Sequence, residues 1–276
     1  MSDKVLPVTR VLEDSFVYSC TFEHQRGFEQ FTGHHVLAFQ FSGETHIQHQ
    51  NGNLVLKENQ VLLARKNQLT KSVKIPSADK EYKSISVILT DISLQQFASD
   101  SDITNSKKYE GENILFLKPD ALIKSYFQSL LSYVEKANRI SKKLATIKTN
   151  EAIEMVLSQK PSLKTFLFDF SNPHKIDLHK FMLQNFHYNV PLENFAKLTG
   201  RSLAGFKRDF EKIFQTSPRK WLQEKRLTEA HYLIHKKKQK PGDIYLDLGF
   251  ENLSHFYTSF KQKFGVTPEL LIRQQP

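Results

Sequence analysis

The sequence has one cysteine, Cys20, and no run of about 18 uncharged apolar residues. A lone thiol excludes an internal disulfide, and its apolar neighbours favour a buried strand position. No apolar run follows a basic start, so we expect neither a signal peptide nor a membrane span, and we expect a cytoplasmic protein without a membrane partner. Neither a glycine-rich phosphate loop nor a nucleophile elbow is present, which argues against an enzyme.

The charge of the chain is unevenly distributed. Its 276 residues suit two domains better than one, and the formal net charge is +10. Residues 171–276 hold 18 Lys and Arg against 10 Asp and Glu, whereas the first 170 residues hold 21 against 19. A basic module favours a polyanionic partner, although a solvated lysine-rich face is the simpler explanation for charge alone.

The C-terminal region repeats itself at an offset of 50 residues. The first copy begins at Pro191 and reads PLENFAKLTGRSLAGFKRDFEKIFQTSP, and the second begins at Pro241 and reads PGDIYLDLGFENLSHFYTSFKQKFGVTP. Seven apolar and proline positions are identical, without an insertion. In each copy a short helix starts at the proline, and in the second copy it is expected to run through Leu248. A glycine-bearing turn then ends this helix.

The second helix of each copy has one apolar stripe. Its members are Leu203, Phe206, Phe210 and Phe214 in the first copy, and Leu253, Phe256, Phe260 and Phe264 in the second. A stripe alone also fits an ordinary core helix, but the duplicated pair of helices predicts two helix-turn-helix units. We expect these units at residues 189–215 and 239–265, joined by a stiff helix over residues 217–235. Such a helix would hold the second helices of the two units at a fixed separation, so that they could contact successive major-groove segments.

This region, residues 177–273, resembles the tandem helix-turn-helix domain of AraC/XylS-type transcription regulators. The resemblance rests on the segments FKRDFEKIFQTSPRKWLQEKRL and GFENLSHFYTSFKQKFGVTPE, and on Arg226-Leu227-x-x-Ala230 in the connecting helix. It implies a DNA-binding regulator, more often an activator, with double-stranded promoter DNA and RNA polymerase as partners. A small-molecule or protein effector is also implied, without its identity.

Candidate DNA contacts follow by position from this resemblance. The base-contact candidates are Ser202, Ala204, Lys207, Arg208, Asn252, Ser254, His255, Tyr257 and Thr258. Arg208 is the strongest, because a guanidinium can donate two hydrogen bonds to guanine O6 and N7. The pair Tyr257-Thr258 replaces the Ser-Arg of many relatives, which removes a common cationic contact from the second unit. The phosphate-contact candidates are Lys212, Arg219 and Lys261.

Residues 16 to about 90 read as many short strands without an intervening helix, which predicts a barrel or sandwich. Asn51-Gly52 is a hairpin signal. The resemblance implies a cupin-like β-barrel that senses an effector. The expected fold class is therefore α+β, with an N-terminal cupin-like barrel, flanking helices and an all-α C-terminal tandem helix-turn-helix domain.

Two helices are expected after the strands, from residue 119 and over residues 142–159. The first has a broad apolar stripe that suits either the open side of the barrel or a second copy of the chain, and we expect a homodimer. The dimer-interface candidates are Leu122, Ile123, Tyr126, Phe127, Leu130, Leu131 and Val134. The expected domains are residues 1–118 (sensor), 119–172 (dimerisation and linker) and 173–276 (DNA binding).

Four histidines in the strand region raise the alternative of a metal-dependent cupin-type enzyme with a basic tail. They are His34, His35, His46 and His49. A catalytic cupin would have His-x-His followed by Glu, which is absent, and His46 and His49 fall on opposite faces of a strand. We therefore expect no metal, no cofactor and no enzymatic activity.

Overall fold

The computed structural model describes residues 8–26, 31–78, 81–104, 107–137, 139–171 and 173–273. The chain divides into two compact units, Met1–Ser171 and Asn172–Pro276. The first unit is rich in strands and the second is helical. In the described part of the chain, no helix is long and apolar enough to cross a bilayer.

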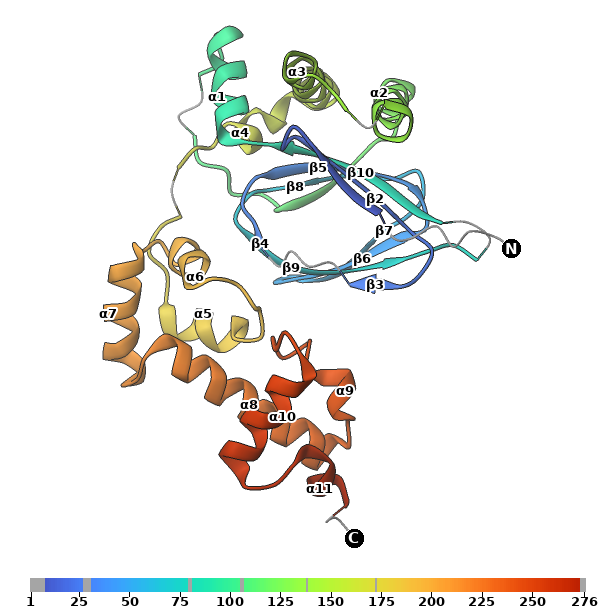
Figure 1. The fold of residues 1–276 in the computed structure, drawn as a ribbon. Coiled ribbons are helices and arrows are strands. Elements are labelled where there is room, and N and C mark those ends of the chain that lie inside the picture. The colour runs from blue at the N-terminus through green and yellow to red at the C-terminus, as the bar shows by residue number, and fades with distance from the viewer. Residues whose placement is uncertain are drawn as a thin grey trace. The chain divides into compact units, whose positions relative to one another are not determined.

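The first unit contains two antiparallel sheets that lie one above the other (Figure 1). Sheet A has the order β1 (Val8–Leu12), β2 (Phe16–Thr21), β10 (Tyr82–Leu89), β5 (His35–Ser42), β8 (Val61–Ala64) and β11 (Ile114–Leu117). Sheet B has the order β3 (Gln25–Arg26), β9 (Gln68–Ile75), β6 (Glu44–His49) and β7 (Gly52–Leu56), with β4 (Phe31–Thr32) also paired to β9. The predicted hairpin at Asn51-Gly52 is confirmed, because His49 pairs with Gly52 across the turn.

The strand-rich N-terminal fold is confirmed, and the expected cupin-like barrel fits loosely, because its two sheets do not close on each other in the described part of the chain. Among the described residues, every strand pairing lies within one sheet and none joins sheet A to sheet B. The chain passes from β5 to β6 through Gly43 alone, whose φ of +71° suits glycine. This sharp turn carries the chain directly from one sheet to the other, so β5 and β6 never become hydrogen-bonded neighbours.

Helices cover the face of sheet A that points away from sheet B (Figure 1). They are α1 (Asp91–Asp100), α2 (Ala121–Ser132), a π-helical turn (Tyr133–Ala137), α3 (Lys142–Gln159), a 3-10 turn (Pro161–Leu163) and α4 (Lys164–Leu167). Asp120 caps α2, since its Oδ1 accepts the N–H of Ile123 at 2.9 Å. Phe39 of β5 stacks on Phe127 of α2, with the ring centroids 5.1 Å apart. The helix expected over residues 142–159 is confirmed as α3.

The apolar stripe that begins in α2 is used almost entirely inside the first unit. Six of its seven residues are at most 8% exposed, whereas Leu122 is 73% exposed. The six buried residues are Ile123, Tyr126, Phe127, Leu130, Leu131 and Val134. They form one core cluster with side chains of β5, β10 and α3. Of the expected dimer contacts, only Leu122 is available to a second copy.

The second unit is built around one long helix. Its elements are α5 (Leu178–Asn185), α6 (Leu192–Leu198), α7 (Leu203–Phe214), α8 (Pro218–Lys237), α9 (Pro241–Ile244), α10 (Leu253–Phe264) and α11 (Pro268–Arg273). Near the start of α8, Trp221 contacts Phe214 of α7 at 4.6 Å between centroids. Further along α8, His231 contacts Phe264 of α10 at 4.7 Å. The central helix therefore supports one helix-turn-helix unit on each half.

The first helix of the second repeat is shorter than expected. The repeat predicts a helix from Pro241 through Leu248, but α9 ends at Ile244 and residues 245–249 form turns. Gly242 lowers the helix propensity of this segment. Ile244, Leu248 and Phe250 are each 5% exposed and join the core around α10. Burial of these side chains therefore holds the segment in place without the regular backbone hydrogen bonds of a helix.

Candidate nucleic-acid interface

The exposed face of α7 holds the first group of predicted contacts. Ser202 is the N-cap, and its Oγ accepts the N–H of Gly205 at 3.2 Å. Ala204, Lys207, Arg208 and Lys212 are exposed, because Phe206 and Phe210 turn the opposite face into the core. The side chain of Arg208 is 80% exposed, and its one ion pair among the described residues is a 3.8 Å contact with Asp209. Arg208 is therefore accessible to a ligand.

The base-contact candidates of α10 carry no fixed charge, and some of them are already hydrogen-bonded within the protein. Asn252 is the N-cap, and its Oδ1 accepts the N–H of His255 at 2.7 Å. Thr258 is exposed, but its hydroxyl donates to the carbonyl of Ser254 at 3.0 Å. Tyr257 is half-buried, and its hydroxyl donates to Glu269 of α11. Within this predicted group, the exposed side chains are Asn252, Ser254, His255 and Thr258, together with the phosphate candidate Lys261.

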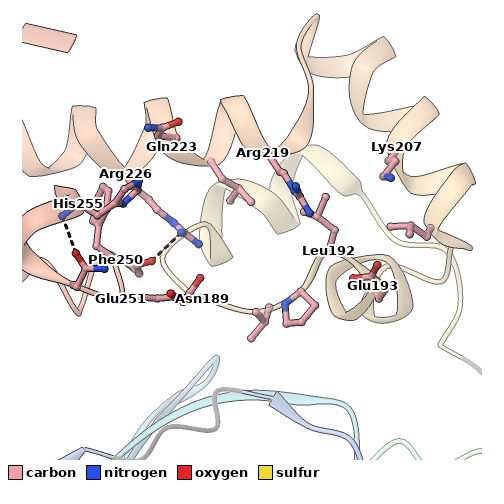
Figure 2. A pocket seen from close by; sticks show the side chains of 16 residues that line it. Asn189, Leu192, Glu193, Lys207, Arg219, Gln223, Arg226, Phe250, Glu251 and His255 are labelled. Carbon is pink, nitrogen blue, oxygen red and sulfur yellow. Dashed lines mark hydrogen bonds between the residues drawn. The ribbon is translucent and has the colours of Figure 1, made fainter. Parts of the chain in front are cut away.

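A cleft of about 840 Å³ lies along α8, between the first turns of α7 and α10 (Figure 2). Among the predicted contacts, its lining brings together Lys207, Arg219, Asn252 and His255. The other predicted contacts lie outside this lining and are Ser202, Ala204, Arg208, Lys212, Ser254, Tyr257, Thr258 and Lys261. The two repeats therefore present the beginnings of their second helices to one shared space.

The cleft also contains side chains that the sequence did not mark as contacts. Asn189, Gln223 and Arg226 supply hydrogen-bonding groups, and Glu193 and Glu251 supply negative charge. Nδ2 of Asn189 donates to Oε1 of Glu251 at 3.0 Å, which joins the segment before α6 to the segment before α10. The side chains of Lys207, Arg219 and Arg226 supply the positive charge.

Arg226 occupies the wall of the cleft and is bound to backbone rather than to a carboxylate. Its guanidinium donates to the carbonyl oxygens of Phe186, Tyr188 and Gly249 at 2.8, 2.8 and 2.9 Å. Burial lowers the pKa of Arg226 to about 10, which leaves the group charged at neutral pH. The sequence marked this arginine only as part of a pattern, because backbone carbonyls have no signature in a sequence.

The four histidines of the strand region do not converge. His35 is fully buried, and neither ring nitrogen has a hydrogen-bond partner among the residues that the structure describes. Nε2 of His46 lies 3.0 Å from Oε2 of Glu44 on the same strand. Within the described ranges, no three His, Cys, Asp or Glu side chains are placed to hold a metal ion.

Comparison with known proteins identifies both parts of the chain. Residues 195–274 match the family model described as "Helix-turn-helix domain". Residues 35–168 match the model described as "ExsA N-terminal regulatory domain".

Among curated proteins, the HTH-type transcriptional regulator ExsA of Pseudomonas aeruginosa is 32% identical over 127 residues, which cover 45% of this chain and 46% of that one. The thermoregulatory protein LcrF of Yersinia pestis is 37% identical over 91 residues, which cover 33% of this chain and 34% of that one. The chain thus spans less than half the length of these relatives.

Among solved structures, an apo ToxT variant from Vibrio cholerae is 13% identical, with a TM-score of 0.47. The match covers 97% of this chain and 100% of that one.

Proposed function

The chain belongs to the AraC/XylS-type family of transcription regulators, and we propose that it binds promoter DNA sequence-specifically through α7 and α10 and thereby changes transcription initiation. The observation that carries this proposal is the duplicated helix pair mounted on α8. Both second helices bury an aromatic stripe and turn polar residues outward. A helix with this division can enter the major groove with its polar face while its apolar face stays in the core.

In this proposal, α7 reads bases and supplies most of the specificity. Arg208 is exposed and its contact with Asp209 is long, at 3.8 Å, so its guanidinium can form a bidentate contact with guanine. Lys207 lies beside it at the edge of the cleft and contacts a base or a phosphate. Ser202 and Ala204 lie at the start of the same helix, where they approach the groove floor.

The second helix, α10, is proposed to contribute less to base recognition. Tyr257 is held by Glu269, and the neutral side chains of Ser254 and Thr258 offer no charge to the groove. Asn252 and His255 still face the cleft and can donate to base edges or phosphates.

The backbone of the DNA is proposed to follow the basic side chains around these helices. Lys212 and Lys261 are exposed on α7 and α10, and Arg219 is exposed at the start of α8. Contacts of this kind release condensed counterions, so binding weakens as salt rises. They also fix the register of the protein on the duplex without reading its sequence.

The first unit is proposed to control DNA binding in response to a small molecule or a protein partner. Support comes from the match of residues 35–168 to a regulatory-domain model. We propose activation as the outcome, with RNA polymerase as a partner, because curated relatives include transcriptional activators.

The proposal is tested by selecting sheared genomic DNA of the source organism with the full-length protein at near-physiological salt. We expect recovery of a shared motif about two helical turns long, since two recognition helices held by α8 contact successive major-groove segments. An Arg208→Ala variant should recover the same motif less efficiently. Recovery of only motif-free DNA, with and without cell extract as a source of effector, would contradict the proposal.

A further inference from the structure

Arg226 joins three segments of the second unit through a single side chain. It lies in the middle of α8, and its three acceptors are 40, 38 and 23 residues away along the chain. Phe186 and Tyr188 belong to the loop that leads from α5 into α6, and Gly249 belongs to the turn that leads into α10. Figure 2 shows Arg226 reaching from α8 toward the segment that carries Phe250 and Glu251.

The guanidinium is suited to this role because it offers rigidly arranged donors. Nε, Nη1 and Nη2 each donate to a different carbonyl, and all three distances are between 2.8 and 2.9 Å. Among the described residues no carboxylate lies within ion-pair distance of this group, so the three carbonyl dipoles, together with the more distant charge of Glu251, stabilise its positive charge. Lysine, with one nitrogen, could not span the three acceptors.

The turn before α10 is shaped to receive this side chain. Gly249 has a φ of +87°, and a Cβ at this position would lie 2.9 Å from Cζ of Arg226 and 2.8 Å from the carbonyl oxygen of His187. Only glycine combines that backbone conformation with such close approach. The hydrogen bond from Asn189 to Glu251 joins the same two segments directly. The segment before α6 and the segment before α10 are thus linked in two ways: through Arg226 of α8, and through the hydrogen bond between Asn189 and Glu251.

We propose that Arg226 is a positioning residue that fixes the distance and rotation between α7 and α10, and so sets the spacing of the two DNA segments that the protein accepts. This inference rests on the proposed function. Each base pair advances the duplex by about 3.4 Å and turns it by roughly a tenth of a helical turn. If α7 and α10 are held rigidly, they cannot both bind when the spacing of the two DNA segments changes. If their relative position is less constrained, they can adjust to the new spacing.

Two linked binding modules gain affinity only when both are engaged at once, and the gain is lost when geometry forbids this. Wild-type protein should therefore bind a selected two-segment duplex at least about tenfold more tightly than a version with one base pair inserted between the segments. Arg226→Gln should bind the selected duplex about tenfold more weakly than wild type, and should distinguish the two spacings by less than about threefold. Binding to a duplex with only the α7 segment should agree within about twofold between wild type and Arg226→Lys, which keeps the positive charge of the cleft.

The experiment measures binding of full-length protein to these three duplexes by fluorescence anisotropy at one salt concentration. Unfolding monitored by Trp221 fluorescence identifies any variant that has not folded. Arg226→Lys keeps the charge and the apolar stem, so it provides a second variant with the same expected loss of spacing preference. Asn189→Ala removes the direct hydrogen bond to Glu251 and leaves Arg226 in place, so it should relax the preference by a smaller factor.

The inference is overturned if folded Arg226→Gln or Arg226→Lys keeps the wild-type spacing preference, or if binding to the single-segment duplex falls as much as binding to the full one. Failure of the wild-type protein to bind any selected duplex would instead count against the proposed function.

Discussion

Nε of Arg201 lies 3.0 Å from Oδ2 of Asp209, so the turn between α6 and α7 is bound to the middle of α7. The same guanidinium donates from Nη1 to the carbonyl oxygens of Ile176 and Thr199 at 3.0 and 2.6 Å. Lys175 also lies 3.1 Å from this carboxylate. The proposed reading helix is therefore held by ionic and backbone contacts as well as by its aromatic stripe.

Asp209→Asn should destabilise the second unit at neutral pH and make its stability less dependent on acid pH. Hydrogen bonds from Arg201 and Lys175 hold the pKa of Asp209 below its usual range. A carboxyl group with a depressed folded pKa stabilises the protein above its unfolded pKa of about 3.9, and this contribution is lost as pH falls through the folded value. Urea unfolding followed by Trp221 fluorescence between pH 7 and pH 3 measures both effects. Glu211→Gln, an exposed neighbour on α7, is the control, and an equal loss for Asp209→Asn at every pH would contradict this account.

Arg208→Ala should weaken binding to a selected duplex by about 1–3 kcal/mol and relax preference at one base pair. Because the side chain is 80% exposed, the free energy of unfolding should hardly change. Lys212→Ala provides the contrast, since loss of a phosphate contact weakens all sequences alike and lowers the salt slope by about 1. Competition binding against single-base variants of the duplex measures the difference. A uniform loss for Arg208→Ala across those variants would assign it to the DNA backbone.

His35→Phe should make the first unit more resistant to mild acid. Burial, with Lys66 and Arg65 nearby, lowers the pKa of His35 to about 3, while Asp169 opposes this effect and His34 adds to it. The unfolded chain, with a histidine pKa of about 6.5, binds the proton more readily, so stability falls as pH drops from about 6.5 toward 3.

Between pH 6.5 and pH 5 this histidine alone should cost wild type about 2 kcal/mol. The phenylalanine ring can keep the contact with Phe166, whose centroid lies 5.2 Å from that of His35. Hydrogen exchange of β5 at the two pH values, corrected for intrinsic rates, measures the change. The same acid sensitivity in His35→Phe would place its origin elsewhere.

Gly249→Ala should destabilise the second unit by about 1–3 kcal/mol, because the new Cβ meets Arg226 and the backbone conformation is unfavourable for alanine. Gly242→Ala is the matched control, because its Cβ would meet no described atom within 4 Å apart from its chain neighbours and the backbone of its own helix, and alanine favours the helix by up to about 1 kcal/mol. Thermal unfolding by circular dichroism should separate the two variants. Equal stability would show that the turn can rearrange.

Self-association, if it uses α2, depends on Leu122. This side chain is 73% exposed and lines a groove of about 330 Å³ with Ile123 and Met155. Leu122→Glu should therefore shift the protein toward monomer in sedimentation velocity without loss of fold. Ile92→Glu, at a similarly exposed position on α1, is the control. An unchanged distribution for Leu122→Glu would exclude this face as the interface.

The helices of the second unit were largely predictable because their signals are local. The stripes of Phe206 and Phe256 follow helical spacing, and Ser202 and Asn252 are caps that bond to amides three residues ahead. The limit of local signals appears at α9, where the mostly apolar segment 244–248 favours a longer helix but burial holds a set of turns.

The candidate site was predictable only in part. The exposed positions on α7 and α10 follow from the opposite face of each stripe, but the sequence could not show that Tyr257 is engaged by Glu269. In the first unit, alternating strands were visible, whereas two sheets and a closed barrel have the same alternation of residues. Whether the strands form two sheets or one barrel depends on which of them pair, and paired strands can be far apart in the sequence.

Residue spacing and neighbouring residues were enough to predict a strand-rich half, a duplicated helical half, the faces of the duplicated helices and the resemblance to AraC/XylS-type regulators. The three-dimensional arrangement was needed to show that six residues of the stripe beginning in α2 are buried and that Arg226 links α8 to two distant segments. Burial and the choice of backbone acceptors are set by contacts between residues tens of positions apart, and such contacts leave no local periodicity in the chain.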